Sequence, residues 1–234
     1  MEQKKPTATY TDIELVIFDC DGVLIDSEIL CKSVLISMLQ DLGVKIDGDY
    51  FDRHFLGKSY DSAKAQIAED FDISLPVAFR DDYLTALLAV FAEELAPTNG
   101  LEDLLHRLVL PKCIATSSHP ERVAFSLKTT ALDSIFNSDI TTSAEVTRGK
   151  PAPDIFLLAA KKMGVLPEKC LVIEDSDAGI IGALSAGMKV VKYTGASHFE
   201  GKQSNSFGEV PVINSWCALP ELYPTLFDDY NRGR

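Results

Sequence analysis

The stretch IELVIFDCDGVLIDSE, residues 13–28, decides the fold, because an apolar run ends there in two acids one residue apart. The run predicts a buried strand, in which successive side chains point to opposite sides. We therefore expect Asp19 and Asp21 to face one cleft while Cys20 faces away. Gly22 then lets the backbone leave the strand. Carboxylates this close need a cation or a shared proton, unless the stretch is merely an acidic surface turn.

Composition and charge restrict the class of protein. The chain has 234 residues, 46% hydrophobic and 24% charged, which suits one domain with an insert or two small domains. Its formal net charge of −13 argues against a nucleic-acid partner, which would need a basic surface. No apolar run approaches the ~20 residues of a membrane span, and residues 1–12 are polar. We expect a cytoplasmic protein without a membrane partner. The sequence does not fix the oligomeric state, and a monomer is expected.

The five cysteines, at positions 20, 31, 113, 170 and 217, are scattered and odd in number. They suit buried thiols in a reducing compartment better than a disulfide framework. No pair has the C-x-x-C spacing of a zinc site, so we expect none of them to bind zinc.

Helical and strand-like patterns occupy different parts of the chain. From residue 29 to about residue 96 the apolar residues recur at helical spacing, without strand-like alternation. From residue 112 onward, short apolar runs alternate with helical segments. These predicted strands lie at residues 113–116, 140–142, 171–174 and 190–193, with predicted helices at 120–131, 153–164 and 178–187.

This order of elements predicts an α/β fold with a doubly wound, Rossmann-like parallel sheet. The all-helical block interrupts the sheet after its first strand, so it is an insertion. We expect a core of residues 1–28 and 98–234 and an inserted all-helical cap domain of residues 29–97.

Polar residues follow the predicted strands, and ligands of an open parallel sheet bind at that edge. The predicted strand at residues 113–116 ends in Thr116, Ser117 and Ser118, where a helix N-terminus could bind phosphate. These hydroxyls could instead simply cap the helix. The predicted strand at residues 171–174 ends in Glu174 and Asp175. The loop after the predicted strand at 140–142 holds Lys150, which could be an ordinary surface lysine. Because four successive strand ends carry such groups, we expect one site.

Four motifs in order resemble the haloacid dehalogenase superfamily of phosphotransferases. They are D-x-D-G-V at residues 19–23, the strand-terminal Thr116, G-K-P-x-P-D at 149–154 and E-D-S-x-x-G-I at 174–180. Each motif alone is weak, but the four together are specific. The helical insertion resembles the small cap of the β-phosphoglucomutase-like subfamily, and the whole pattern is most similar to sugar-phosphate phosphatases such as 6-phosphogluconate phosphatases.

The resemblance implies a role for each residue of the predicted site. Asp19 would be the nucleophile that forms an aspartyl-phosphate, and Asp21 the acid and base. Thr116 and the N–H of Ser117 would hold phosphoryl oxygens, while Lys150 would neutralise charge on them and on Asp19.

The resemblance also implies a magnesium cofactor. Mg²⁺ would lie between Asp19, the backbone carbonyl of Asp21 and Asp175, with Glu174 orienting the site from outside the first coordination sphere. The substrate would be a small phosphorylated metabolite.

The chain departs from the β-phosphoglucomutase pattern at two places. Such mutases carry a His where this chain has Cys31, and an Arg in the cap loop where it has Lys58. We therefore predict a phosphatase, with an intramolecular phosphotransferase as the alternative and a non-catalytic binding protein as the second alternative. In the cap, Gly57, Lys58 and Ser59 are the candidate substrate-binding residues, unless Lys58 is an ordinary exposed lysine.

Two further acids, Asp26 and Glu28, follow the first motif. We expect both to make backbone hydrogen bonds that shape the hinge to the cap. Trp216 is expected in the core or in the packing of the C-terminal segment.

Overall fold

A parallel β-sheet forms the centre of the molecule, and the computed structural model describes residues 12–56, 58, 60–136, 139–202 and 207–228. Within these residues the sheet has six strands in the order β3-β2-β1-β4-β5-β6, and every pairing is parallel. The strands are β1 (Leu15–Phe18), β2 (Lys112–Thr116), β3 (Ile140–Thr142), β4 (Cys170–Glu174), β5 (Lys189–Tyr193) and β6 (Val212–Ile213). The predicted α/β class with a parallel sheet is confirmed.

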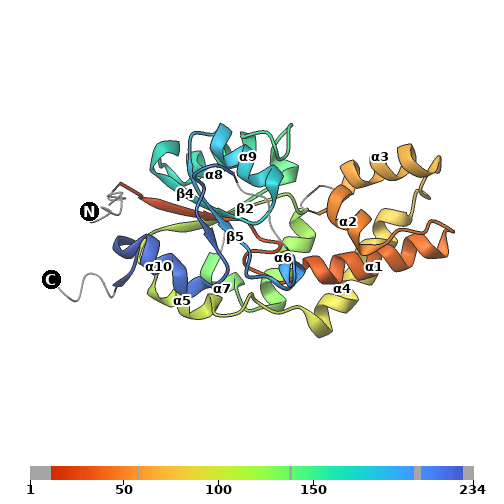
Figure 1. Cartoon of the computed structure of the whole chain (residues 1–234), viewed down its shortest axis with the longest axis horizontal. Helices are drawn as coiled ribbons and strands as arrows, with labels where there is room; N and C mark the ends of the chain where they lie inside the picture. The colour runs from red at the N-terminus through yellow and green to blue at the C-terminus, as the bar shows by residue number, and fades with distance from the viewer. Residues whose placement is uncertain (1–11, 57, 59, 137–138, 203–206, 229–234) are drawn as a thin grey trace, which may run out of the picture.

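Helices cover both faces of the sheet and form a separate group beside it. They are α1 (Glu28–Asp41), α2 (Gly48–His54), α3 (Tyr60–Phe71), α4 (Phe79–Glu94), α5 (Leu101–Arg107), α6 (Pro120–Thr129), α7 (Asp133–Phe136), α8 (Asp154–Met163), α9 (Asp177–Ser185) and α10 (Leu219–Leu222). Figure 1 shows α8 and α9 on one side of the sheet and α5, α7 and α10 on the other. None of the helices in the described residues is long and apolar enough to cross a membrane.

The central strand β1 is buried on both faces, because its side chains alternate between two apolar clusters. Val16 and Phe18 pack into the cluster under α5, α6 and α7, while Leu15 and Ile17 pack against α8 and α9. A strand covered on both sides needs apolar residues at every position, which explains the continuous run in the sequence. The order of the strands reverses at β1, so its carboxyl end lies at the switch point of the sheet.

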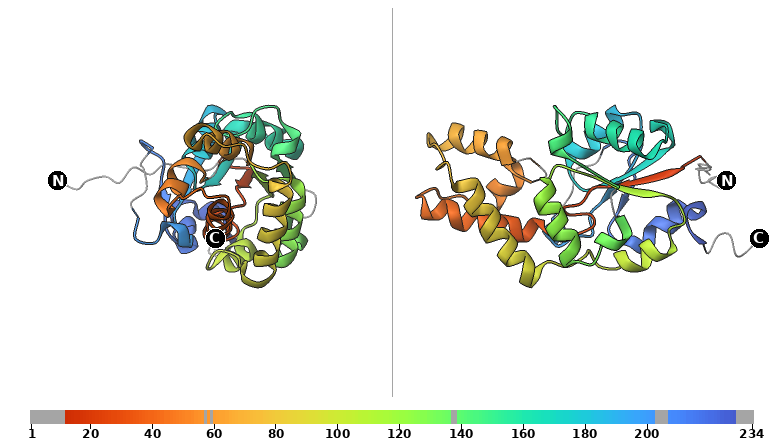
Figure 2. Two further views of the ribbon diagram at one scale, coloured as in Figure 1. Left: turned by 90° about the vertical axis from the view of Figure 1, so that its right-hand side faces the viewer. Right: turned by 180° about the vertical axis from the view of Figure 1, so that it is seen from behind.

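Helices α1–α4 lie beyond the carboxyl end of the sheet (Figures 1 and 2), and α6 of the core packs against α4. The chain leaves the core and returns to it at neighbouring places: Ile25 bridges Pro97, and the N–H of Thr98 donates to the carbonyl of Leu24 at 3.0 Å. This pairing fixes the two connections side by side. We propose that residues 29–97 form the cap and that residues 1–28 and 98–234 form the core.

The structure differs from the sequence prediction mainly in short elements. The helix α5 and the edge strand β6 were not predicted, because the former follows a turn-rich link and the latter has only two residues. The five cysteines are free, and four of them are buried as expected, while Cys217 is exposed.

Trp216 joins the C-terminal segment to the core. Its ring stacks on Tyr193 with centroids 4.1 Å apart, and its Nε1 donates to Thr98 Oγ1 at 2.9 Å. Thr98 Oγ1 in turn donates to the carbonyl of Val23 at 2.6 Å. The tryptophan therefore contacts the sheet at Tyr193 and, through Thr98, the chain segments that lead into and out of the cap. This confirms its expected place in the core.

Replacing Trp216 with Phe should lower the free energy of unfolding by about 2–4 kcal/mol, because it leaves a cavity and removes the donor to Thr98. Urea denaturation followed by circular dichroism measures this loss. Leu166→Ala, at a position 58% exposed, is the control and should change stability by less than about 0.5 kcal/mol. Equal losses for both variants would contradict the central packing role of Trp216.

Candidate active site

A cleft of about 520 Å³ lies between the carboxyl end of the sheet and the cap. The core lines it with strand-end and loop residues, and the cap lines it with side chains of α3 and α4. The lining includes Asp19, Asp21, Thr116, Ser117, Lys150 and Glu174 from the core, and Lys58, Tyr60, Arg80 and Tyr83 from the cap. The structure thus brings together the groups that the strand ends predicted.

Lys150 connects the first and fourth strands through two carboxylates. Its Nζ donates to Asp19 Oδ1 and, at 2.6 Å, to Glu174 Oε1. The lysine side chain is 2% exposed, so it is not the solvated loop lysine of the alternative interpretation. A buried ammonium between two carboxylates holds Asp19 in one orientation toward the cleft.

Glu174 is a buried positioning group rather than part of the open surface. Its Oε2 accepts hydrogen bonds from the N–H and the hydroxyl of Ser176, at 2.8 and 3.0 Å. Ser176 also caps α9, since its Oγ accepts from the N–H of Gly179 at 3.0 Å. The first turn of α9 therefore fixes Glu174, which in turn fixes Lys150.

Asp21 is paired with a different cation. Arg122 of α6 donates to its Oδ1, and the hydroxyls of Ser27 and Ser118 donate to its two oxygens at 2.6 and 2.5 Å. Arg122 comes from the first turn of the helix that follows Thr116. The two strand-end aspartates are therefore neutralised separately, Asp19 by Lys150 and Asp21 by Arg122.

Asp175 lies directly beneath the turn that ends β1. A Cβ built on Gly22 would be 2.1 Å from Asp175 Oδ2, and Gly22 has a φ of +76°. Glycine is thus required both by the backbone conformation and by the approach of the carboxylate. Asp175 also contacts His198, whose Nε2 is 3.1 Å from Oδ2.

Burial and crowding change the acidities of these groups. Burial raises the pKa of Asp19 well above its usual value, and Lys150 only partly opposes this. Burial and the neighbouring Glu174 raise the pKa of Asp175. Asp21 behaves differently, because Arg122 and its hydroxyl donors outweigh burial and lower its pKa.

The chemistry of the donors suits a divalent metal ion. Three buried carboxylates, Asp19, Glu174 and Asp175, and the partly buried Asp21 share two cationic side chains, Lys150 and Arg122, so negative charge exceeds positive charge at the site. Hard oxygen donors and excess negative charge favour Mg²⁺. Among the described residues no three acidic, His or Cys side chains are grouped to hold a metal by themselves. The predicted set is compatible with this, because it uses two side chains and a backbone carbonyl.

The remaining predicted residues fall into two groups. Thr116 is buried at the end of β2, where its Oγ1 accepts from the N–H of Ser118 at 3.1 Å, and Ser117 lines the cleft beside it. In the cap, Lys58 lines the cleft, whereas Gly57 and Ser59 lie outside the described residues.

Sequence reasoning missed Arg122 and His198, and it placed Ser118 at the strand end without its hydrogen bond to Asp21. Arg122 has no distinguishing pattern in the sequence, because an arginine in the first turn of a helix is usually exposed. Its burial against Asp21 depends on the packing of α6 under α4, where its guanidinium lies 5.5 Å from the centroid of Phe91.

Comparison with known proteins identifies the family. The model of the haloacid dehalogenase-like hydrolases matches residues 13–187, which include all four motifs. The chain belongs to this family, and the resemblance predicted from the sequence is confirmed.

Three relatives show how far the likeness extends. The chain is 28% identical to a 6-phosphogluconate phosphatase of Escherichia coli (strain K12), over 90% of this chain and 95% of that protein. It is 35% identical to a probable pseudouridine-5'-phosphatase of Drosophila melanogaster, over 75% and 79%. A crystal structure of a haloacid dehalogenase-like protein from Agrobacterium tumefaciens, of unknown function, has a TM-score of 0.75 at 32% identity and covers 91% and 98% of the two chains. The chain is a phosphoric monoester hydrolase of this family.

Gly179→Ala should disrupt the site from a distance, because a Cβ there would be 1.7 Å from Glu174 Oε1. Alanine ordinarily stabilises a helix relative to glycine by about 1 kcal/mol, but here it displaces a buried ion-paired carboxylate, which costs about 3 kcal/mol or more. We expect lower stability in urea and at least about a hundredfold lower phosphate release.

The control for this variant is Ser185→Ala, at an exposed position of the same helix. It should retain the stability and the activity of the parent protein. A Gly179→Ala protein that also retained both would mean that Glu174 can move without consequence for Lys150.

Proposed function

We propose that this protein is a Mg²⁺-dependent phosphatase that hydrolyses small phosphorylated metabolites, with sugar phosphates as the main class, through an aspartyl-phosphate on Asp19. The observation that carries the proposal is the arrangement of two aspartates, one buried and one partly buried, with separate cations at the floor of one cleft. Asp19 is held by Lys150 and Asp21 by Arg122. A nucleophile and an acid–base group need such different surroundings to act in succession.

In the first step a carboxylate oxygen of Asp19 attacks phosphorus. The bond from phosphorus to the ester oxygen breaks, and Asp21 gives its proton to that oxygen so that it leaves as an alcohol. Lys150 reduces the negative charge at Asp19 and on the phosphoryl oxygens. Thr116 and the N–H of Ser117 bind those oxygens at the end of β2.

In the second step water attacks the phosphorus of the aspartyl-phosphate. Asp21, now a carboxylate, accepts the proton of the water, and the carboxylate of Asp19 is released together with inorganic phosphate. Arg122, Ser27 and Ser118 all donate to Asp21 and favour its carboxylate form. Their contacts therefore suit the second step, in which Asp21 is the base.

The residues proposed to hold Mg²⁺ are Asp19, the backbone carbonyl of Asp21 and Asp175, with Glu174 supporting them through Lys150. When bound, Mg²⁺ supplies positive charge that screens the repulsion between the substrate phosphate and the carboxylates. Asp175 contacts His198 in the structure, so metal binding would compete with that contact.

The substrate class rests on the cap and on the relatives. The cleft has cap side chains that can donate hydrogen bonds, Lys58, Tyr60 and Arg80 among them. The relatives include a phosphatase named for 6-phosphogluconate. A screen of phosphorylated metabolites with phosphate release as the readout tests the proposal. An isomerised product in place of free phosphate would indicate an intramolecular phosphotransferase.

Asp19→Asn should reduce turnover to below about a thousandth of the parent value, roughly 4 kcal/mol of barrier, because an amide is a poor nucleophile. Steady-state phosphate release measures this, with circular dichroism to confirm folding. Asp103→Asn, the same change at an exposed position of α5, should retain full activity. Turnover above that limit in Asp19→Asn would exclude covalent catalysis at this residue.

Chelation should abolish turnover, and added Mg²⁺ should restore it. Ca²⁺ should substitute poorly, because its larger and looser coordination sphere misplaces the nucleophile relative to phosphorus. Asp175→Ala should raise the Mg²⁺ concentration needed for half-maximal rate by at least about tenfold. A titration of Mg²⁺ into the chelated enzyme measures both effects, and full turnover in excess chelator would remove the metal from the mechanism.

A further inference from the structure

Glu28 is a buried carboxyl group that the proposed chemistry leaves unused. It lies in the first turn of α1, where the chain passes from the core into the cap, and it is 8% exposed. Its side chain was expected to make backbone hydrogen bonds, but the carboxyl group forms no hydrogen bond or ion pair with any described residue and interacts with its charged neighbours only at longer range. Asp26, by contrast, fulfils the expectation by accepting from the N–H and the hydroxyl of Ser197.

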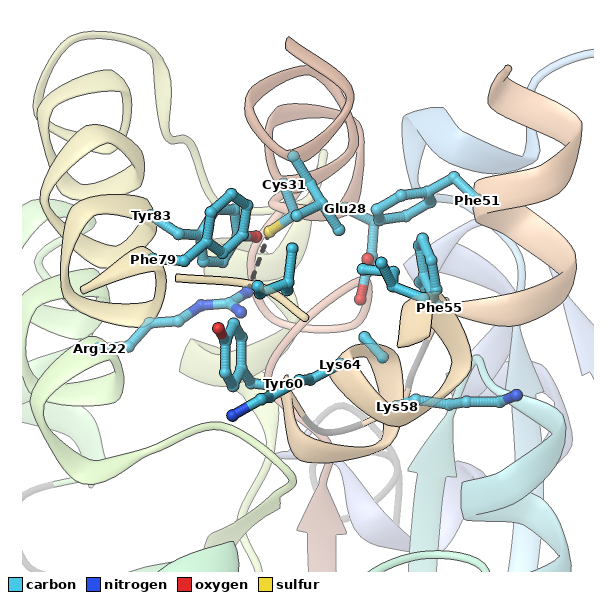
Figure 3. Close-up of a pocket in the computed structure, with 14 residues that line it drawn as sticks. Glu28, Cys31, Phe51, Phe55, Lys58, Tyr60, Lys64, Phe79, Tyr83 and Arg122 are labelled. Atoms are coloured by element: carbon cyan, nitrogen blue, oxygen red, sulfur yellow. Dashed lines mark hydrogen bonds between the residues drawn. The ribbon is translucent and has the colours of Figure 1, made fainter. Parts of the chain in front are cut away.

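The carboxyl group of Glu28 faces a cavity. A hollow of about 80 Å³ within the cap adjoins the catalytic cleft, and Glu28 lines both of them. Figure 3 shows the side chain directed from α1 into the space between the cap helices. Glu28 is therefore more than nine-tenths buried and yet open on one side to a site that a ligand can enter.

Arg122 borders the same cavity with an unused donor. One terminal nitrogen, Nη2, contacts Asp21 Oδ1 and, at 3.1 Å, Cys31 Sγ. Its Nε is buried and has no hydrogen-bond partner among the described residues. Figure 3 shows the guanidinium reaching the cavity from α6, on a different side from Glu28. Glu28 thus gives the cavity wall a buried acceptor without a hydrogen-bond partner, and Arg122 gives it a buried donor without one, whereas Lys58 and Lys64, which also line the cavity, are exposed residues.

The other walls of the cavity are largely apolar and aromatic. They include Leu35, Phe51, Phe55, Ile67, Phe79 and Tyr83. Lys58 also lines the cavity, but its ammonium points away from Glu28 and Arg122 in Figure 3. A carboxyl group in such surroundings is poorly solvated, and burial, followed by the charges of Asp21 and Asp175, raises the pKa of Glu28 to about 8.

The chemistry of the cavity selects among ligands. An apolar group would leave both Glu28 and Arg122 Nε without partners, which is costly in a buried site. A second phosphate could bind Arg122 but would lie close to a carboxyl group and to the charge of Asp21. Hydroxyl groups can donate to Glu28 and accept from Arg122, so a ligand with several hydroxyls satisfies both.

We propose that Glu28 and Arg122 form a subsite for hydroxyl groups of the substrate, so that the enzyme selects polyhydroxylated monophosphates. The subsite lies in the cap cavity, beyond the position of the reacting phosphate. This inference rests on the proposed phosphatase function and specifies its substrate class. Glu28 is then a specificity-determining residue at the hinge of the cap.

The test compares substrates that differ by one hydroxyl. The best monosaccharide phosphate from the phosphate-release screen is assayed beside its complete set of monodeoxy analogues. The wild-type enzyme should lose at least about tenfold in kcat/KM with one or more analogues. In Glu28→Ala the same ratio should fall to within about threefold of unity, because the hydroxyl has lost its partner.

Glu28→Gln provides a second variant that keeps the shape of the side chain. Its amide oxygen still accepts a hydrogen bond, so the ratio should lie between those of the wild type and Glu28→Ala. This variant also serves if Glu28→Ala does not fold. A purely structural role of Glu28 would lower kcat/KM for all the substrates by the same factor and leave the ratio unchanged.

Binding gives a readout that does not depend on turnover. In an Asp19→Asn background, isothermal titration of the sugar phosphate and its analogues should show a partial loss of discrimination when Glu28→Gln is added and the larger loss when Glu28→Ala is added. An unchanged ratio of kcat/KM between the sugar phosphate and its monodeoxy analogues in the Glu28 variants would overturn the inference. A wild-type enzyme that tolerates every monodeoxy analogue, or that prefers a sugar bisphosphate to the monophosphate, would also overturn it. A wild-type enzyme that releases phosphate from no metabolite would instead refute the proposed function.

Discussion

Electrostatic repulsion among four carboxylates is the constraint on which this site depends. Asp19 and Asp21 end β1, and Glu174 and Asp175 end the adjacent strand β4, so the parallel sheet itself crowds them together. Two cations oppose this repulsion, Lys150 from the loop before α8 and Arg122 from α6. The positions of both helices are thus tied to the charge at the end of the sheet.

The cap is connected to this charge cluster through α6 and the hinge. Arg122 contacts Asp21 on the core side and Cys31 on α1, so one side chain joins the acid–base group to the cap. Glu28 lies at the start of the same helix, between the catalytic cleft and the cap cavity. Under our proposals, the residues that bind the phosphate and those that contact the rest of the substrate lie next to one another at this hinge.

The sequence predicted the strands and strand ends well, because a strand buried on both faces leaves a continuous apolar run and its polar end is abrupt. It placed Asp19, Lys150 and Glu174 together correctly, although Arg122 and His198 were missed. Their burial comes from packing between segments far apart in the chain, which leaves no local pattern. Glu28 was misjudged for the same reason, since its lack of partners depends on the cavity formed by the cap helices.

The most direct test of this account is to detect the phosphoryl group on Asp19. The Asp21→Asn variant, mixed with an activated aryl phosphate that needs no protonated leaving group, should accumulate the intermediate because water is no longer activated. Rapid acid quenching and peptide mass spectrometry should then find one added phosphoryl group on the peptide that contains Asp19, assigned to that residue by fragmentation. Phosphate release from Asp21→Asn without any modified peptide, or with the group on another residue, would contradict the account.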